Sequence, residues 1–423
     1  MNQISERGLW WSEARFGMFI HWGMYAVAAR HEWVQSREEI HPEKYARYQD
    51  YFTPDQFEPR EWASLAKKAG MKYFVITAKH HDGYCMWDTK FSDYKVKRDY
   101  LGEVIEAFRD AGLKVGLYYS LIDWHHPDFV IDVNHPLRNA PNIDELNAPR
   151  KQKRYAKYMR DQVGELLGNY GKIDIIWFDF SYPREDGRGK GREDWESEKL
   201  LALARKLQPE ILVDDRLDLP GSADFSSPEQ YVPEYGIRDE EGKLLPWEGC
   251  QTFSGAWGYF RDELTWKTPR QVLTMLVKHV SRGGNLLMNI GPNARGSIDP
   301  RATSILRQVE AWMRDHQAAI YGCGAAPEEM PEPENCRYTY NAKTKRLYIH
   351  ILSWPQKFLH LPKMQGKLSF ARFLHDHSEI IMREEGAPHS NMSAKTSPDT
   401  VTLLMPAIAP DVEIPVVELF LRS

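Results

Sequence analysis

RYAKYMRDQVGELLGNYGKIDIIWFDF, residues 154–180, consists of a helical stretch, a glycine and a short apolar run of β-forming residues. The same order occurs earlier, where LGEVIEAFRDAG precedes KVGLYYS (within 101–120) and PDQFEPREWASLAKKAG precedes YFVITAKHH (within 54–81). In the earliest of these, Phe57, Trp62 and Leu65 share a face at helical spacing. Three successive helix–glycine–strand units predict βα repeats and a parallel sheet.

Further strand-like runs extend this pattern over the first three quarters of the chain. They are FGMFIHWG (16–23), DIIWFDF (174–180), ILVDDR (211–216), NLLMNIG (285–291) and, more weakly, CQTF (250–253). No GxGxxG turn follows the first run, which disfavours a dinucleotide-binding, doubly wound sheet. We therefore expect an α/β fold of the (β/α)₈-like, TIM-type barrel.

The residue pattern changes near residues 326–336, which are rich in Pro and Glu and lack periodicity. Beyond them lie short alternating runs such as RLYIHIL (346–352) and TVTLLMP (400–406), separated by turns. Such runs are typical of an antiparallel β-sandwich. The expected domains are a barrel over 1–330 and a small C-terminal β-sandwich over 331–423.

The charge distribution excludes several classes of partner. The formal net charge is −5, with 55 basic and 60 acidic residues that are scattered along the chain, so neither nucleic acid nor an anionic membrane is expected to bind. Charges interrupt every apolar stretch of the first 19 residues, from which we expect no signal peptide, no membrane span and a cytoplasmic location. The four cysteines are too far apart for a disulfide framework or a zinc site. The sequon at Asn391 would matter in a secreted protein.

Polar residues stand at the carboxyl ends of five predicted strands, where barrel enzymes have their active sites. The strand ends are His21-Trp22, His80-His81-Asp82, Tyr118-Tyr119-Ser120, Trp177-Phe178-Asp179 and Asp214-Asp215-Arg216. Burying so many polar groups without a ligand would leave them needing hydrogen-bond partners. The pattern predicts a functional cleft.

Asp179 is the leading candidate for catalysis, since strand alternation places it on the same face as Trp177, at the rim of the barrel. A carboxylate there could attack an anomeric carbon or bind a metal. A glycosidase needs a second carboxyl group, roughly 5–5.5 Å away for retention or 6.5–9.5 Å for inversion. Glu229, Glu234 and Glu248 follow the fifth strand, and a solvated loop carboxylate is the simpler interpretation of Glu234.

The histidine-rich pieces KHHDG (79–83) and DWHHPDF (123–129) suggest a metal site, because imidazole and carboxylate are ordinary zinc ligands. Adjacent histidines on a strand point to opposite sides, and the chain has no HxH, HExxH or paired CxxC motif. We therefore expect no metal and no cofactor. SRGGNLLMNIGPNARG (281–296) lacks the GK[ST] ending of a phosphate-binding loop, which favours a tight turn and a buried strand.

Several long motifs resemble those of the α-L-fucosidases of glycoside hydrolase family 29. They are FGMFIHWG, HEW at 31–33, YFVITAKHHDGYCMWDTKFSDY, GLYYSLIDWHHPDF, IIWFDF, PWEGCQTFSGAWGY and SRGGNLLMNIGPNARG, in a family-like order and spacing. The resemblance implies a catalytic barrel that releases L-fucose from fucosylated glycans by a retaining double displacement, without a cofactor. Asp179 would be the nucleophile.

The resemblance also implies the residues of a fucose site. These are His21, Glu32, Trp33, His80, His81, Tyr118, Trp177, Arg216 and Trp257. The SSPEQ context (226–230) favours Glu229 as the acid/base, ahead of Glu248 and Glu234. The chain departs from the family at Phe180, where glycine commonly follows the nucleophile.

Three alternatives remain at this stage. The first is a non-catalytic sugar-binding protein on the same scaffold, which the presence of Asp179 disfavours. The second is a metal-dependent barrel hydrolase, and the third is a related glycosidase that acts on another sugar, such as a galactoside. A homo-oligomer is compatible with any of them.

Overall fold

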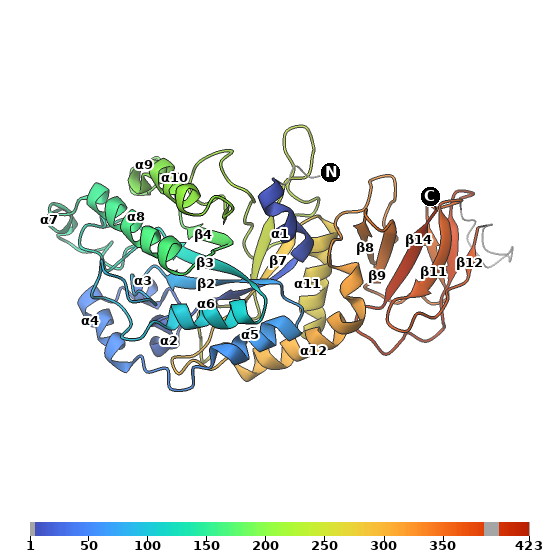
Figure 1. Cartoon of the computed structure of the whole chain (residues 1–423), viewed down its shortest axis with the longest axis horizontal. Coiled ribbons are helices and arrows are strands. Elements are labelled where there is room, and N and C mark those ends of the chain that lie inside the picture. Colours follow the sequence, from blue (N-terminus) through green and yellow to red (C-terminus); the bar gives the residue numbers. More distant parts are fainter. Residues whose placement is uncertain (1–4, 385–396, 423) are drawn as a thin grey trace.

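The computed structural model describes residues 5–384 and 397–422, so the sequon at Asn391 lies outside the described residues. Within the described part, seven strands form one parallel sheet in the order β5-β4-β3-β2-β1-β7-β6 (Figure 1). The strands are β1 (Phe16–Ile20), β2 (Tyr73–Lys79), β3 (Lys114–Ser120), β4 (Ile175–Asp179), β5 (Leu212–Val213), β6 (Glu248–Thr252) and β7 (Asn285–Ile290). The predicted parallel sheet is confirmed, including the weakest strand, β6.

Most strands end one to three residues earlier than the apolar runs that predict them, because their polar ends leave the ladder. β5 is the extreme case and spans Leu212–Val213. The chain turns away at Asp214, whose carboxylate accepts a hydrogen bond from the Phe178 backbone N–H at 3.1 Å. The polar ends are therefore free to line the carboxyl edge of the sheet.

Helices connect the strands and cover the outside of the sheet. They are α1 (Leu9–Ala14), α2 (Tyr25–Ala28), α3 (Val34–Arg37), α4 (Pro42–Ala46), α5 (Pro59–Lys68), α6 (Tyr100–Asp110), α7 (Ile143–Asn147), α8 (Gln152–Asn169), α9 (Arg192–Trp195), α10 (Ser197–Leu207), α11 (Pro269–Ser281) and α12 (Pro300–His316). Short 3₁₀ turns cover Glu6–Gly8, Arg47–Tyr51 and Gln317–Ala319. In Figure 1, α5, α6 and α12 lie together below the sheet, while α8, α9 and α10 lie above it.

The helices begin and end where the sequence chemistry directs. α5 starts with Pro59, whose missing N–H is unpaired at a helix start in any case, and Gly70 beyond its end has φ +89°. At the start of α6, the Asp99 side chain accepts the Gly102 N–H at 2.9 Å. The buried faces of these helices carry large side chains such as Trp62 and Phe108, which pack against the sheet.

Residues 224–230 join the two edge strands of the parallel sheet. The Asp224 N–H donates to the Val213 carbonyl of β5 at 2.8 Å. Farther along, the Cys250 N–H of β6 donates to the Pro228 carbonyl at 3.1 Å, and the Gln230 N–H donates back to the Cys250 carbonyl at 3.0 Å. The segment therefore pairs with β6 in parallel, after it has contacted β5.

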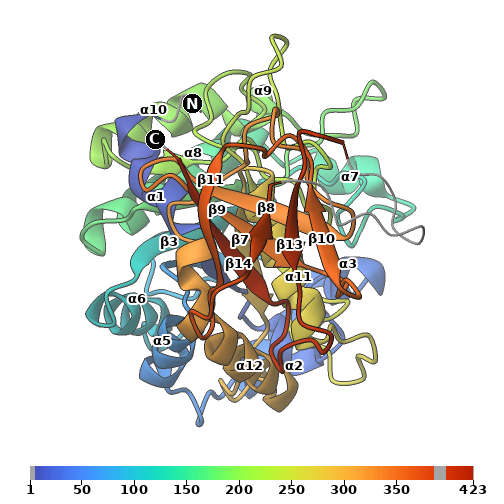
Figure 2. The same cartoon turned by 90° about the vertical axis from the view of Figure 1, so that its right-hand side faces the viewer.

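The C-terminal part consists of antiparallel strands, as expected (Figure 2). In the described residues one sheet has the order β11-β14-β9-β8 and the other β10-β13-β12. The strands are β8 (Cys336–Asn341), β9 (Arg346–Ile351), β10 (Phe358–Leu361), β11 (Leu368–Phe373), β12 (Met382–Arg383), β13 (Val401–Leu404) and β14 (Val416–Leu421). Apolar side chains of both sheets, among them Leu347, Leu361 and Leu403, form a separate core.

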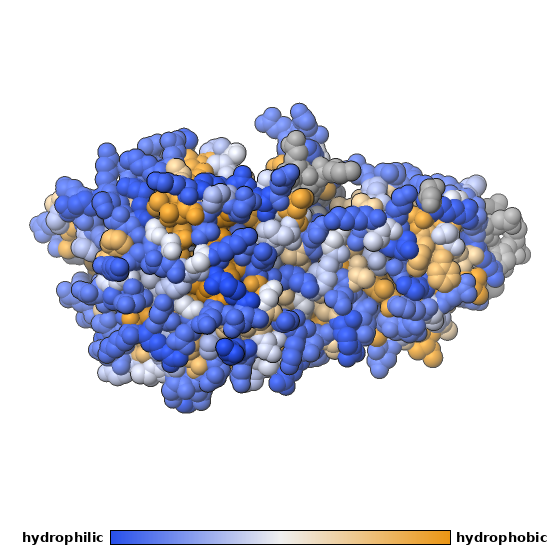
Figure 3. Space-filling view, in the orientation of Figure 1, coloured by the Kyte–Doolittle hydropathy of each residue, from blue (hydrophilic) through white to orange (hydrophobic). Residues whose placement is uncertain are grey.

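Polar side chains cover most of the face seen in Figure 3, and apolar groups gather between α8 and α10. All four cysteines are buried and unbridged, and burial raises the pKa of each thiol. Among the described helices, none has the length and apolar character needed to cross a membrane.

Candidate active site

Asp179 is the last residue of β4, and its carboxylate receives two short hydrogen bonds. The Tyr118 hydroxyl of β3 donates to Oδ2 at 2.6 Å, and Arg216 Nη1 donates to Oδ1 at 2.6 Å. His81 Nε2 lies 3.9 Å from Oδ2. Burial opposes ionisation of Asp179, but the charge of Arg216 and these donors outweigh it, so the pKa of the carboxyl is lowered. The Asp179 carboxylate is therefore ionised at neutral pH and held in one orientation by its two donors.

Arg216 links Asp179 to Glu229. Its Nη2 donates to Glu229 Oε2 at 2.9 Å while Nη1 binds Asp179, so one guanidinium contacts both carboxylates. Nε donates to the Ser227 hydroxyl at 3.0 Å, and the guanidinium lies 4.5 Å from the Trp177 ring centroid. A planar donor fork above an aromatic face has little freedom to rotate.

Glu229 lies in the segment that pairs with β6, and 42% of its side chain is exposed, against 10% for Asp179. Gln230, which follows it, has φ +61° and anchors the turn, because its side-chain amide donates to the Thr252 hydroxyl at 3.0 Å. Arg216 therefore contacts the accessible carboxyl of Glu229 and the buried carboxyl of Asp179.

Three buried histidines stand next to the carboxylates. His21 Nδ1 lies 2.7 Å from Asn289 Oδ1, and His81 Nδ1 lies 2.7 Å from the Ser120 hydroxyl. The His80 ring centroid is 4.0 Å from that of His81, and His80 Nδ1 has no hydrogen-bond partner among the described residues. Burial lowers the pKa of His21 to about 3 and of His81 to about 4, so both rings are neutral at neutral pH.

Glu32 and the loop that carries Trp257 come together although they are more than 200 residues apart in the sequence. The Glu32 carboxylate accepts the Gly258 N–H at 2.8 Å, and burial raises the pKa of this carboxyl. The Trp257 ring centroid lies 5.1 Å from that of His21. A polar acceptor and an aromatic face thus flank the histidines.

Trp33 and Trp177 occupy different levels of the site. The Trp33 ring is half-buried and meets His81 edge-on at 4.8 Å. Trp177 is 1% exposed and its Nε1 donates to Glu248 at 3.3 Å. Trp177 therefore lies beneath Arg216, in the buried interior.

The other two carboxyl candidates are not near Asp179. Glu248 is the first residue of β6 and pairs with Asn285, the first residue of β7, whereas Asp179 is the last residue of its parallel strand. Burial raises the pKa of Glu248 to about 7, and the indoles of Trp11 and Trp177 and the Tyr73 hydroxyl donate to its carboxyl oxygens. Glu234 is exposed, and its backbone carbonyl binds Arg282 just beyond α11.

Sequence reasoning missed Asn289, which we interpreted as part of a buried strand. Its amide donates to the Trp257 carbonyl at 2.7 Å and its oxygen faces His21. Asn289 alternates with Leu287 near the carboxyl end of β7, the same signal that identified the other strand-end residues. It connects the Trp257 loop to the histidines.

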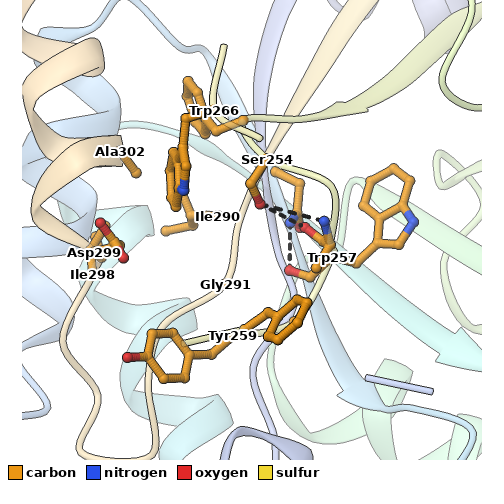
Figure 4. A pocket seen from close by; sticks show the side chains of 14 residues that line it. Ser254, Trp257, Tyr259, Trp266, Ile290, Gly291, Ile298, Asp299 and Ala302 are labelled. Carbon is orange, nitrogen blue, oxygen red and sulfur yellow. Dashed lines mark hydrogen bonds between the residues drawn. The ribbon is translucent and has the colours of Figure 1, made fainter. Parts of the chain in front are cut away.

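A small cavity lies behind that loop, with about 20 Å³ of space that water can enter. It is lined by Trp266, Tyr259 and Asp299 among others, and in Figure 4 the Trp257 ring points away from it. This space holds about one water molecule and no sugar ring. Within the described chain, no group of three or more His, Cys, Asp or Glu residues is placed to hold a metal ion.

Known proteins are similar to this chain in sequence and in architecture. A family model described as Alpha-L-fucosidase matches residues 2–318. The tissue α-L-fucosidase of Rattus norvegicus is 31% identical over 380 residues, which are 82% of this chain and 76% of the relative. The structure of α-L-fucosidase isoenzyme 1 from Paenibacillus thiaminolyticus has 43% identity and a TM-score of 0.91, covering 99% of each chain.

A family 29 fucosidase from Bacteroides thetaiotaomicron, solved as a trapped covalent intermediate, is 25% identical with a TM-score of 0.84 and covers 100% of this chain and 97% of its own. A covalent intermediate is the signature of a retaining double displacement. The chain thus belongs to the α-L-fucosidases of glycoside hydrolase family 29, which are retaining glycosidases.

Proposed function

We propose that this fucosidase uses Asp179 as its nucleophile and Glu229 as its acid/base. The observation that carries the proposal is the single guanidinium of Arg216, which binds both carboxylates. One of the two is buried and its pKa is lowered, as a nucleophile requires, and the other faces the open side, where a leaving group departs.

In the first step Asp179 attacks C1 of the fucoside as Glu229 gives its proton to the departing glycosidic oxygen. The C1–O bond to the aglycone breaks and an ester bond to Asp179 forms. The proton that the departing oxygen takes up is the one that Glu229 carries into this step.

In the second step Glu229 removes a proton from water, which attacks C1 from the face that the aglycone left. The ester bond breaks and Asp179 departs as a carboxylate, so two inversions give net retention. Tyr118 and Arg216 stabilise that carboxylate through the hydrogen bonds they already make.

The polar residues around Asp179 are suited to a sugar with several hydroxyl groups. Neutral His21, His80 and His81 can donate or accept, and Glu32 accepts. Trp33 and Trp257 offer apolar faces, which match the methyl group of a 6-deoxy sugar. Terminal α-L-fucosides on glycans are the substrate class that this combination favours.

Two structural features belong to the same proposal. Residues 224–230 act as an irregular eighth strand that closes the barrel between β5 and β6, supported by their backbone hydrogen bonds to both strands. The antiparallel sheets act as a β-sandwich accessory domain over 331–423, supported by their shared apolar core.

The test is hydrolysis of a 4-nitrophenyl α-L-fucoside by the wild type and by Asp179→Gly with added azide. We expect the variant to lose activity by several orders of magnitude and to recover part of it by forming the inverted β-fucosyl azide, identified by NMR. Glu229→Ala with azide should instead form the retained α-fucosyl azide.

The corresponding α-L-galactoside, which adds a hydroxyl at C6, is the control for the sugar. A wild-type enzyme that prefers the galactoside to the fucoside would overturn the assignment of α-L-fucosides as the substrate class. An Asp179→Gly variant with full activity, or an inverted azide from Glu229→Ala, would overturn the assignment of the carboxylates.

A further inference from the structure

Asn289 and His21 meet on one face of two neighbouring strands. β1 and β7 run parallel, and Phe19 of β1 pairs with Asn289 of β7. His21 follows Phe19 by two positions, and its backbone N–H continues the ladder to the Ile290 carbonyl at 3.0 Å. Because side chains alternate along a strand, the His21 ring and the Asn289 amide lie on the same face of the sheet. Both side chains are buried.

The Trp257 carbonyl fixes the orientation of the Asn289 amide. Asn289 Nδ2 lies 2.7 Å from this carbonyl oxygen and donates to it. A carbonyl oxygen can only accept a hydrogen bond, so the end of the amide that faces it must be the NH₂ group. The amide oxygen Oδ1 is therefore the atom that faces His21 Nδ1, at 2.7 Å.

This contact decides which nitrogen of His21 carries a proton. An amide oxygen has no proton to give, so Nδ1 must be the donor in the contact with Asn289. Burial lowers the pKa of His21 to about 3, and a neutral imidazole has one N–H. Nε2 is therefore an unprotonated acceptor. In the described part of the chain the ring has no hydrogen-bond partner besides Asn289, which leaves Nε2 available for a ligand.

The His21 ring borders the proposed nucleophile. Its centroid lies 5.4 Å from that of Tyr118, whose hydroxyl binds Asp179. The charges of Asp179 and Arg216 both act on the pKa of His21, and the His80 centroid is 5.5 Å away. A sugar in position for attack by Asp179 therefore lies within reach of this ring.

We propose that Asn289 is a positioning residue of the fucose site, which holds His21 as the Nδ1–H tautomer and so makes Nε2 an acceptor for a hydroxyl group of the sugar. This inference rests on the proposed function. It narrows the role of His21, because a neutral ring with its proton on Nδ1 cannot donate to the sugar. The group recognised at this point must be a donor, so an ether or a fluorine in its place weakens binding.

The first measurement is the tautomer of His21 in the wild-type enzyme, by NMR of protein that carries isotope-labelled histidine. Nitrogen shifts distinguish an N–H nitrogen from an unprotonated one, and His21→Gln identifies the signals by their loss. At neutral pH we expect a proton on Nδ1 and none on Nε2. Addition of L-fucose should shift the Nε2 signal and leave the proton on Nδ1. A proton on Nε2, with or without L-fucose, would overturn the inference.

Three variants measure the contribution of Asn289. Asn289→Leu removes both hydrogen bonds, whereas Asn289→Asp keeps an oxygen opposite His21 Nδ1. Asn285→Leu is the matched control, since Asn285 lies at the other end of β7, is also buried and also donates to a tryptophan carbonyl, that of Trp11, at 2.8 Å. Circular dichroism and the melting temperature verify that each variant is folded.

In Asn289→Leu we expect part of the His21 population to move its proton to Nε2. The Kd of L-fucose, from titration calorimetry, and the KM for the aryl fucoside should both rise about tenfold, as for the loss of one hydrogen bond. Asn289→Asp should keep the proton on Nδ1 and lose less affinity than Asn289→Leu. Asn285→Leu should change neither the tautomer nor the Kd.

A wild-type Kd for L-fucose in Asn289→Leu, or an unchanged tautomer there, would overturn this inference and leave the proposed function standing. An equal loss of affinity in Asn285→Leu would attribute the effect to a disturbed strand β7 and also overturn it. Wild-type inactivity on the fucoside would instead overturn the proposed function, and the spectrum of the free enzyme would still decide the tautomer.

Discussion

Arg216 has a role that lysine cannot fill, because its two terminal nitrogens bind different carboxylates while its plane stacks on Trp177. A lysine ammonium is a compact charge without a fork or a stacking face. Burial alone would raise the pKa of Asp179, but the positive charge of Arg216 helps to outweigh burial, and the pKa of Asp179 is lowered.

The Tyr118 hydroxyl also stabilises the ionised form of Asp179, and this contact leads to a prediction about pH dependence. Its hydrogen bond lowers the pKa of Asp179, so Tyr118→Phe should raise that pKa. Since the proposed nucleophile Asp179 would react as the carboxylate, the acidic limb of the kcat/KM profile should move to higher pH, with kcat reduced at least about tenfold.

Tyr119→Phe is the matched control, because the adjacent hydroxyl donates to Gln162 at 2.8 Å, away from the carboxylate. This variant should lose about 1 kcal/mol of stability and keep the wild-type pH profile. An acidic limb that moves equally in both variants would contradict the role of Tyr118. The measurement is the initial rate of aryl fucoside hydrolysis from pH 3 to 9.

Glu248 affects stability at the other end of the parallel strands, where it is the first residue of β6. Burial raises its pKa from an ordinary 4.5 to about 7, so the folded protein binds this proton more tightly than the unfolded chain. The contribution of Glu248 is therefore fully present below pH 4.5 and is lost as pH rises towards 7. At about 1.36 kcal/mol per pKa unit, the loss amounts to roughly 3 kcal/mol.

Glu248→Gln should remove this pH dependence, because an amide does not ionise in that range. The free energy of unfolding of the variant minus that of the wild type should therefore increase from pH 5 to pH 8. Urea unfolding at several pH values measures this difference. Glu234→Gln, at an exposed site, is the comparison and should follow the wild type. A constant difference between Glu248→Gln and the wild type across this range would disprove the raised pKa.

At the level of the elements, the N-terminus of α11 shows local chemistry that a sequence pattern can detect. The Gln271 N–H donates to the Thr268 hydroxyl at 3.2 Å, and the Thr268 N–H donates to the Gln271 side chain at 2.8 Å. This reciprocal pair is a capping box, with Pro269 at the first helical position. It begins the helix directly after the loop that carries Trp257.

Thr268→Ala should therefore lower the free energy of unfolding by about 1 kcal/mol, because the Gln271 N–H loses the hydroxyl that accepts it. KM for the fucoside should not change. Thr274→Ala, in the middle of the same helix and away from the cap, should be neutral or slightly stabilising, since alanine is the better helix former. Chemical unfolding of both variants measures the difference, and equal losses would contradict a cap-specific effect.

For the molecule as a whole, α12 joins the parallel sheet to the antiparallel part. Trp312 is 4% exposed, stacks on His316 at 4.7 Å and donates its indole N–H to the Ile414 carbonyl at 3.3 Å. Arg270 of α11 adds a hydrogen bond to the Leu352 carbonyl at 2.6 Å. The Trp312 contact is buried and ties the two parts together, so both parts should unfold together.

Trp312→Ala should cost about 3–5 kcal/mol, as expected for a large buried side chain. Thermal unfolding should still show a single transition at a lower temperature. Two separated transitions in the wild type would contradict the expected coupling. Arg314→Ala, exposed on the same helix, serves as the surface control and should be nearly neutral.

Local pattern was sufficient to predict the strands, the helices between them and the change to antiparallel structure after residue 330. It also located Asp179 and Arg216, because each follows a short apolar run at the carboxyl end of a parallel strand. These features depend on the order of residues within a few turns of chain. Alternation and periodicity carry that information directly.

The partner of Asp179 depended on the tertiary structure. Glu229, Glu234 and Glu248 lie within twenty positions of one another, yet the pairing of 224–230 with β6 brings Glu229 alone of the three to Arg216. Glu248 lies at the opposite end of the parallel strands, and Glu234 faces solvent. Which side chains meet is decided by contacts between distant segments, and no local pattern encodes those contacts.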